Sequence, residues 1–175
     1  MKIHIREVDR NNPNEVDLIV GRCMETVLET VPEFNNDPMM ARDALPNFTF
    51  EEMKSMILGA THDPHHKIIV ASAMDGEMMG HSIFSIKKDS DGFTYGSFFS
   101  RYIAPEHRRM GLASRLLEEA EGWMKEMGAQ YSQAQTHVKN YKLQNLFRKF
   151  GYKVTGPKMA KWPYYELKKD LLGSD

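Results

Sequence analysis

A chain of 175 residues with 41% hydrophobic and 27% charged residues is typical of one globular domain, so we expect a single domain over residues 1–175. Its 23 Lys and Arg against 24 Asp and Glu give a formal charge of −1, which argues against a general binder of nucleic acid or of anionic membranes. One cysteine allows no internal disulfide, which fits a cytoplasmic protein, and no apolar run is long enough to predict a membrane span or a signal peptide.

The first part of the chain predicts a strand, a helix and a loop. Residues 3–8 alternate imperfectly between apolar and polar side chains, as a strand does. Asn14 is the expected N-cap of a helix whose apolar stripe includes Cys23, so a buried thiol is favoured over a nucleophile at that position. Residues 33–47 contain prolines and acids with little periodicity and predict a loop, which could hold a short helical turn at residues 39–45.

A second helix and a meander of three strands follow. Thr49 and Glu52 match a capping box, in which each side chain binds the backbone N–H of the other, and the helix that they begin continues to Ala60. Asp75 and Gly76 form a two-residue hairpin signal between two strands. The strands of the meander are predicted at residues 67–74, 77–87 and 93–103.

The turn after the third meander strand carries the strongest functional signal. An amphipathic helix is predicted over residues 112–127, and the turn before it contains Arg108, Arg109 and Gly111. A helix N-terminus has free backbone N–H groups and a partial positive charge, so these residues predict a local anion site. Solvated surface charge is the alternative for the two arginines.

The last third of the chain predicts a strand, a helix and a hairpin. Residues 131–138 must be a strand if the strand, helix, strand unit is to close, and their polarity suggests that one face meets water or a ligand. Residues 140–150 predict a short helix that ends at Gly151. Two closing strands are expected at residues 152–155 and 162–167, with a turn at Gly156-Pro157.

This order of elements resembles the GNAT superfamily of acyl-CoA-dependent N-acyltransferases. The acetyl-CoA motif of that family is Gln or Arg, two residues, Gly, one residue, then Gly or Ala, and Arg108, Gly111 and Ala113 match it in its usual place. The resemblance implies an α/β (α+β) fold, with a mixed, mostly antiparallel sheet flanked by helices and with splayed fourth and fifth strands. A second family signature is resembled by Asn140, Leu146, Phe147, Gly151 and Tyr152.

The resemblance implies acetyl-CoA as the co-substrate and assigns residues to it. Backbone N–H groups from Arg109 to Ser114 would hold the pyrophosphate, and the strand end at Tyr102 and Ile103 would pair with the pantetheine arm. Asn140 would also contact that arm. The complete set of expected co-substrate residues is Tyr102, Ile103, Arg108, Arg109, Met110, Gly111, Leu112, Ala113, Ser114 and Asn140.

The residues that move protons are less well defined. Many relatives carry a glutamate base on the fourth strand, but residues 93–103 contain no acid, which leaves His81 and His137 as candidate bases. Phe147 stands where many relatives have a tyrosine that protonates the thiolate, which leaves Tyr141 as the candidate acid. A packing or surface role for each of the three, with proton transfer through water, is the alternative.

By resemblance the reaction is transfer of an acetyl group to a primary amine, on a small metabolite or on a peptide. Acids between Glu33 and Asp43 could attract such a cation, and a solvated loop is the alternative for them. A catalytically weak acyl-CoA-binding module is the alternative function, because the strand acid and the helix tyrosine are missing. We expect no metal, no nucleic acid and no membrane partner, and homodimers are common in the family. The sequence does not identify the acceptor.

Overall fold

A computed structural model describes residues 2–45 and 47–173 of the chain, so Pro46 of the predicted loop lies outside it. The predicted order of elements is present. The elements are β1 (Ile3–Glu7), α1 (Pro13–Thr30), a 3₁₀ turn (Pro32–Phe34), α2 (Pro38–Ala44), α3 (Phe50–Ala60), β2 (His66–Ala73), β3 (Met78–Lys88), β4 (Thr94–Ile103), a second 3₁₀ turn (Pro105–His107), α4 (Leu112–Glu126), β5 (Tyr131–His137), α5 (Tyr141–Lys149), β6 (Lys153–Lys158) and β7 (Tyr164–Asp170).

Seven strands form one sheet in the order β1-β2-β3-β4-β5-β7-β6. Neighbouring strands run antiparallel except β4 and β5, which are parallel and are connected through α4. This topology confirms the mixed, mostly antiparallel sheet. Among the residues that the structure describes, no helix combines the length and the apolar character that crossing a bilayer requires.

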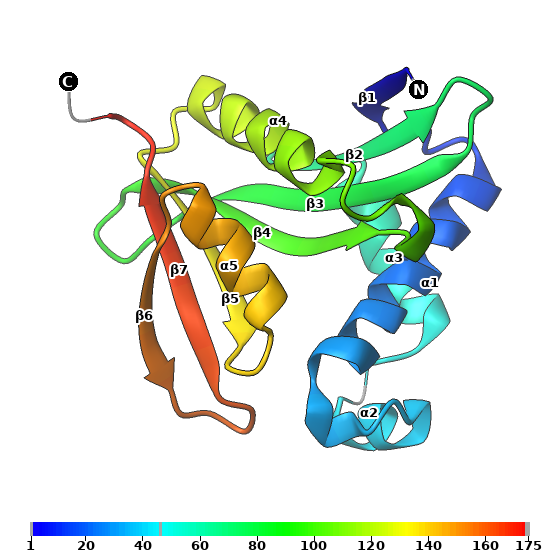
Figure 1. The fold of residues 1–175 in the computed structure, drawn as a ribbon, viewed down its shortest axis with the longest axis horizontal. Coiled ribbons are helices and arrows are strands. Elements are labelled where there is room, and N and C mark those ends of the chain that lie inside the picture. The colour runs from blue at the N-terminus through cyan, green and yellow to red at the C-terminus, as the bar shows by residue number, and fades with distance from the viewer. Residues whose placement is uncertain (1, 46, 174–175) are drawn as a thin grey trace.

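Helices cover both faces of the sheet, and β2 shows why. Its alternate residues point to opposite faces, so Ile68 and Val70 pack in the core beneath α1 and α3, whereas Ile69 and Ala71 pack beneath α4. A third, smaller core lies where α5 covers β5 and β7. Figure 1 shows α4 and α1 on opposite sides of the central strands, with α5 beside β5.

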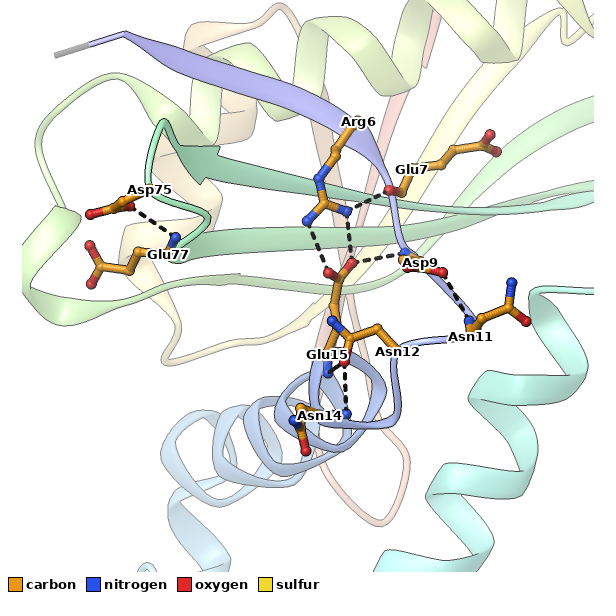
Figure 2. Close-up of polar contacts among 9 residues, drawn as sticks. All are labelled: Arg6, Glu7, Asp9, Asn11, Asn12, Asn14, Glu15, Asp75 and Glu77. Atoms are coloured by element: carbon orange, nitrogen blue, oxygen red, sulfur yellow. Dashed lines mark hydrogen bonds and ion pairs between the residues drawn. The ribbon is translucent and has the colours of Figure 1, made fainter.

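The first helix begins two residues earlier than predicted. Asn12, not Asn14, is its N-cap: the Asn12 side-chain oxygen accepts hydrogen bonds from the N–H groups of Asn14 and Glu15, at 3.2 and 3.4 Å (Figure 2). Pro13 explains the difference, because its fixed φ suits the first helical position and it has no N–H that a cap would need to satisfy. The predicted burial of Cys23 on this helix is confirmed, since 2% of it is exposed.

A buried carboxylate ties the start of α1 to β1. Both oxygens of Glu15 accept hydrogen bonds from the Arg6 guanidinium at 2.9 Å, and one also accepts from the N–H of Asp9 at 2.9 Å. Figure 2 shows this carboxylate pointing from the helix toward the strand. The contacts satisfy the acid that lies in the first turn of the helix, where negative charge is favourable.

The two parallel strands separate soon after they meet. Residues 95–97 of β4 pair with residues 131–133 of β5, and no further pair joins these strands within the described residues. In Figure 1 the two strands then diverge, and β5 turns away from β4 beneath α5. The splay of the fourth and fifth strands is therefore confirmed. It leaves one edge of β4, from residue 98 to its end, without a neighbouring strand.

The closing hairpin differs from the prediction. Gly156-Pro157 is not the turn but lies inside β6, where the pairing with β7 is irregular between Thr155 and Lys158. β6 is an edge strand, and a bulge on an edge tolerates a proline because the missing N–H disrupts no second neighbour. The reversal of the chain lies instead between Lys158 and Tyr164, and Trp162 within it packs edge-on against Phe34, with ring centroids 5.1 Å apart.

Candidate functional site

The turn between β4 and α4 exposes a run of backbone donors. Arg109 and Gly111 adopt left-handed conformations, with φ of 66° and 77°, and Gly111 is the residue that precedes the helix. Within the described part of the chain, no N–H from Arg109 to Ser114 donates to a protein acceptor. These N–H groups lie at the positive end of a helix of 15 residues. The arrangement is suited to binding phosphate.

The side chains of this turn leave the donors accessible. Arg108, Arg109 and Met110 are exposed, and the Nε of Arg108 donates to the carbonyl oxygen of Ile103 at 3.0 Å. A Cβ on Gly111 would meet nothing within 4 Å, so the space in front of the helix is open. Leu112 differs from its neighbours because its side chain is buried in the core, which leaves only its backbone for a ligand.

The free edge of β4 continues from this turn. The N–H of Ala104 donates to the carbonyl oxygen of Met79 on the β3 side at 2.9 Å. Because polar main-chain groups alternate along a strand, those of Arg101 and Ile103 point to the other side, into the space between β4 and β5. Those of Tyr102 point toward β3. Of the two strand residues predicted to pair with a pantetheine arm, Ile103 has that orientation and Tyr102 does not.

His81 and Cys23 form a buried group beneath Tyr102. The Nε2 of His81 lies 3.6 Å from the Sγ of Cys23 and 3.4 Å from the Oγ of Ser100, and its ring stacks on that of Tyr102 with centroids 6.1 Å apart. Burial, together with the nearby positive charge of Arg22, lowers the pKa of His81 to about 3. Burial raises the pKa of the Cys23 thiol to about 11. The imidazole is therefore neutral and has no exposed surface at which to meet an acceptor.

His81 should make the protein sensitive to acid. Its folded pKa of about 3 lies below the ordinary 6.5, so only the unfolded chain binds a proton between these values and stability is lost as pH falls. Between about pH 7.5 and about pH 5, we expect His81 to remove about 2 kcal/mol of unfolding free energy. Urea unfolding of the wild type and of His81→Gln at both pH values measures this. An equal loss in the two proteins would contradict the assignment.

His137 is paired with an acid from the other half of the chain. Its Nδ1 accepts the N–H of Lys139 at 3.1 Å, so Nε2 carries the proton and donates to the Glu33 carboxylate at 3.1 Å. Burial would raise the pKa of Glu33, but hydrogen bonds from its own backbone and from His137 hold it below its usual range. The neutral imidazole thus has no lone pair left for an acceptor, and the pair joins the end of β5 to the turn after α1.

The residues predicted on α5 have different environments. Asn140 is the N-cap, because its side-chain oxygen accepts the N–H of Leu143 at 3.2 Å. Tyr141 is 65% exposed, as a solvated tyrosine would be. Phe147 is fully buried, with its ring centroid 4.6 Å from that of Tyr152. The position of the usual family tyrosine is therefore filled by a packed ring without a hydroxyl.

Arg101 was not among the predicted site residues, although a charged residue within a strand rich in aromatic residues is a signal for a site. It extends from β4 to α5, and its guanidinium carbon lies 4.1 Å from the ring centroid of Phe147 and 4.6 Å from that of Phe98. Its Nε and Nη1 are buried and meet no hydrogen-bond acceptor among the described residues. Burial lowers the pKa of Arg101 to about 10, which leaves it charged at neutral pH.

One group of side chains near the turn between β4 and α4 could hold a metal ion. Within residues 2–45 and 47–173, ligand atoms of Glu77, Glu106 and His107 lie within 4.8 Å of one another, and the two glutamates are exposed. The Nε2 of His107 is already hydrogen-bonded to Glu77 at 3.1 Å. That bond accounts for the proximity of the imidazole, and the expectation that no metal takes part stays a prediction.

Comparisons with known proteins agree with this geometry. A model of the acetyltransferase (GNAT) family matches residues 28–152. Aminoglycoside N(6')-acetyltransferase type 1 of Serratia marcescens is 25% identical over 127 residues, covering 69% of this chain and 87% of that protein. The PaiA N-acetyltransferase of Thermoplasma acidophilum, in complex with coenzyme A, has a TM-score of 0.72 at 19% identity, with 97% of this chain and 100% of that chain covered. Spermidine N-acetyltransferase of Vibrio cholerae, with CoA and spermine, has a TM-score of 0.70 at 14% identity, with 98% of each chain covered.

Proposed function

This chain belongs to the GNAT family of acetyltransferases, and we propose that it transfers the acetyl group of acetyl-CoA to a primary amine on a small, positively charged molecule. The observation that carries this proposal is the separation of β4 from β5 just ahead of the open turn of α4. An anion site that continues into a free strand edge suits a donor in which a pyrophosphate is joined to a long arm containing amides.

The donor would follow one path from the turn into the gap. The N–H groups of residues 109–114 bind pyrophosphate oxygens, and the guanidinium groups of Arg108 and Arg109 add charge-assisted contacts. Ile103 and Arg101 offer main-chain groups to the amides of the arm, as a neighbouring strand would. Asn140 uses its oxygen to cap α5 and keeps its amide nitrogen for the arm.

Glu33 is our candidate for recognising the acceptor. Its carboxylate is held at the end of β5 by His137, and its lowered pKa keeps it negative at neutral pH. A second positive charge on the acceptor would bind there while a neutral amine attacks. Aminoglycosides and spermidine, the compounds named in the Serratia and Vibrio relatives, are small amines with several positive charges, which supports a small acceptor over a peptide.

The reaction follows from these contacts. The amine nitrogen attacks the thioester carbonyl carbon, the C–S bond breaks, its electron pair leaves on sulfur, and the proton lost by nitrogen passes to water. A main-chain N–H of Arg101 or Ile103 would stabilise the oxyanion, a contribution of about 3 kcal/mol in other acyl-transfer sites. Of the three predicted proton carriers, His81 is fully buried and His137 has both ring nitrogens hydrogen-bonded, so neither is free to take the proton of the amine. Tyr141 stays a prediction, and the water route accounts for the proton without it.

A screen of amines tests the proposal. The purified protein is mixed with acetyl-CoA and a panel of polyamines, aminoglycosides and amino-terminal or lysine-containing peptides, and release of free thiol is followed together with the mass of the acceptor. We expect release that depends on a polycationic small amine and the mass gain of one acetyl group. Glu33→Gln should raise KM for that amine while the affinity for CoA is unchanged. Tight CoA binding without turnover across the panel would favour the binding module instead.

A further inference from the structure

A guanidinium without a hydrogen-bond acceptor at two of its nitrogens lies where β4 and β5 separate. Arg101 lies on β4 beyond the last residue that pairs with β5, and its guanidinium contacts the ring of Phe147 on α5. Figure 1 shows α5 over β5. Buried charges are normally paired, because desolvating an ion is costly. Yet two nitrogens of this group, Nε and Nη1, are buried without an acceptor in the part of the chain that the structure describes. The Arg101 guanidinium therefore carries two hydrogen-bond donors that no described residue accepts.

Among the described residues no acid forms an ion pair with this guanidinium, although the Glu121 carboxylate is near enough to favour its charged form. The rings of Phe98 and Phe147 contact it and carry no charge. The nearby titratable groups are the Tyr152 hydroxyl, which is hydrogen-bonded to the Oγ of Ser132 at 2.6 Å, and the Glu121 carboxylate, which is bonded to Lys169 at 2.6 Å. Neither lies within ion-pair or hydrogen-bond distance of Arg101. A ligand that brings negative charge into the gap would therefore meet an available positive charge.

We propose that the Arg101 guanidinium binds and stabilises the thiolate of coenzyme A as the acetyl group leaves it. This inference rests on the proposed function, which places the donor arm along β4. An arm that enters from the turn at residues 108–114 and runs back along residues 103 to 98 ends at the inner end of the gap. Phe98 is located there, and Phe147 packs against it with ring centroids 5.6 Å apart. The guanidinium lies over both rings, next to the expected position of the sulfur.

The step balances without a proton donor in the gap. When the C–S bond breaks, its electron pair stays on sulfur, and the nearby positive charge of a guanidinium that remains protonated stabilises the thiolate. Solvent protonates the thiolate after release. The buried ring of Phe147 has no hydroxyl to perform this protonation, so electrostatic stabilisation by Arg101 takes the place of a general acid.

The thiol pKa of bound CoA tests this inference in the intact protein. It is followed by thiolate absorbance in a pH titration of CoA bound to the wild type, to Arg101→Met and to Arg101→Lys. An opposite charge at this distance should lower the pKa of the bound thiol by about 1 unit or more relative to free CoA. Arg101→Met should lose the shift and Arg101→Lys should keep part of it. The control is Arg148→Met, which removes an exposed guanidinium from the same helix that carries Phe147.

A second measurement uses the wild type alone, in case Arg101→Met does not fold. Its affinity for CoA relative to desulfo-CoA should rise with pH over the range in which the thiol ionises.

A third measurement is kinetic. With acetyl-CoA and an active amine, Arg101→Lys should lower kcat while KM for acetyl-CoA stays nearly constant.

The outcomes separate the two proposals. A bound thiol pKa equal to that of free CoA, a shift that survives in Arg101→Met, or a flat affinity ratio would overturn the role of Arg101. If acetylation proceeds normally in that case, only the role of Arg101 fails. If the wild type does not bind CoA at all, the proposed function fails and the inference fails with it.

Discussion

Gly111→Trp is expected to weaken acetyl-CoA binding by about 100-fold, because the loss of two charge-assisted hydrogen bonds to the pyrophosphate costs about 3 kcal/mol. Gly111 precedes α4, and a Cβ there would point into open space, where the indole would cover the N–H groups of the first helical turn. Its φ of 77° also favours glycine over other residues. Calorimetric titration with acetyl-CoA measures the loss.

The matched control is Gly92→Trp. Gly92 lies in the turn at the opposite end of β4, has a φ of 85°, and would also meet nothing with an added Cβ. Both substitutions impose the same backbone strain, about 1 kcal/mol, but only one occupies the anion site. We expect Gly92→Trp to lower stability without changing the affinity for acetyl-CoA. Equal affinities for acetyl-CoA in the two variants would show that this turn does not bind the pyrophosphate.

Phe147→Ala should produce the largest loss of stability, about 3 to 5 kcal/mol, as other truncations of buried aromatic residues do. The ring is fully buried and packs against Phe98 and Tyr152, with the Arg101 guanidinium on its face. It belongs to the small core under α5, which has few other large side chains to close the cavity. Chemical denaturation followed by circular dichroism gives the unfolding free energy.

Phe99→Ala is the control for this substitution. It removes the same side chain from β4 at a position that is 54% exposed, so we expect a cost below about 1 kcal/mol. A similar cost for both truncations would mean that Phe147 is not tightly packed.

Phe147→Ala also bears on the proposed role of Arg101. A guanidinium that loses an aromatic face should become more mobile and should stabilise the thiolate less well.

Local patterns predicted most of the fold and failed at specific places. The alternation in the meander led to the correct strands, but the turn at Asp75-Gly76 is not the predicted two-residue hairpin. The Ala73 N–H donates to the Glu77 carbonyl oxygen across a three-residue loop, and Gly76, with a φ of 92°, takes the left-handed position at its end. The predicted cap at Asn14 is wrong because Pro13 occupies the first helical position and moves the cap to Asn12. The predicted turn at Gly156-Pro157 is wrong because a sequence does not reveal that a strand lies at a sheet edge, where a bulge is tolerated.

The two histidines that were predicted as bases show why the sequence alone could not define the catalytic site. Each of the two histidines is buried among groups from distant parts of the chain. His81 meets Cys23 of α1, which makes it a neutral core residue. His137 meets Glu33, 104 residues away, which uses its last free nitrogen. Neither pairing has a local signature, so the sequence could identify the imidazoles but not their protonation.

The sequence by itself determined the open turn at residues 108–113 and its free backbone N–H groups, because backbone conformation and helix N-terminal charge depend mainly on neighbouring residues. Only the tertiary structure decided which side chains surround the inner end of the path that we propose for the CoA arm along β4. The splay of β4 from β5, the packing of Phe147 and the isolation of Arg101 each require elements far apart in the chain to meet. Burial and charge pairing determine how such groups ionise and bind, and both are properties of packed surfaces rather than of local sequence.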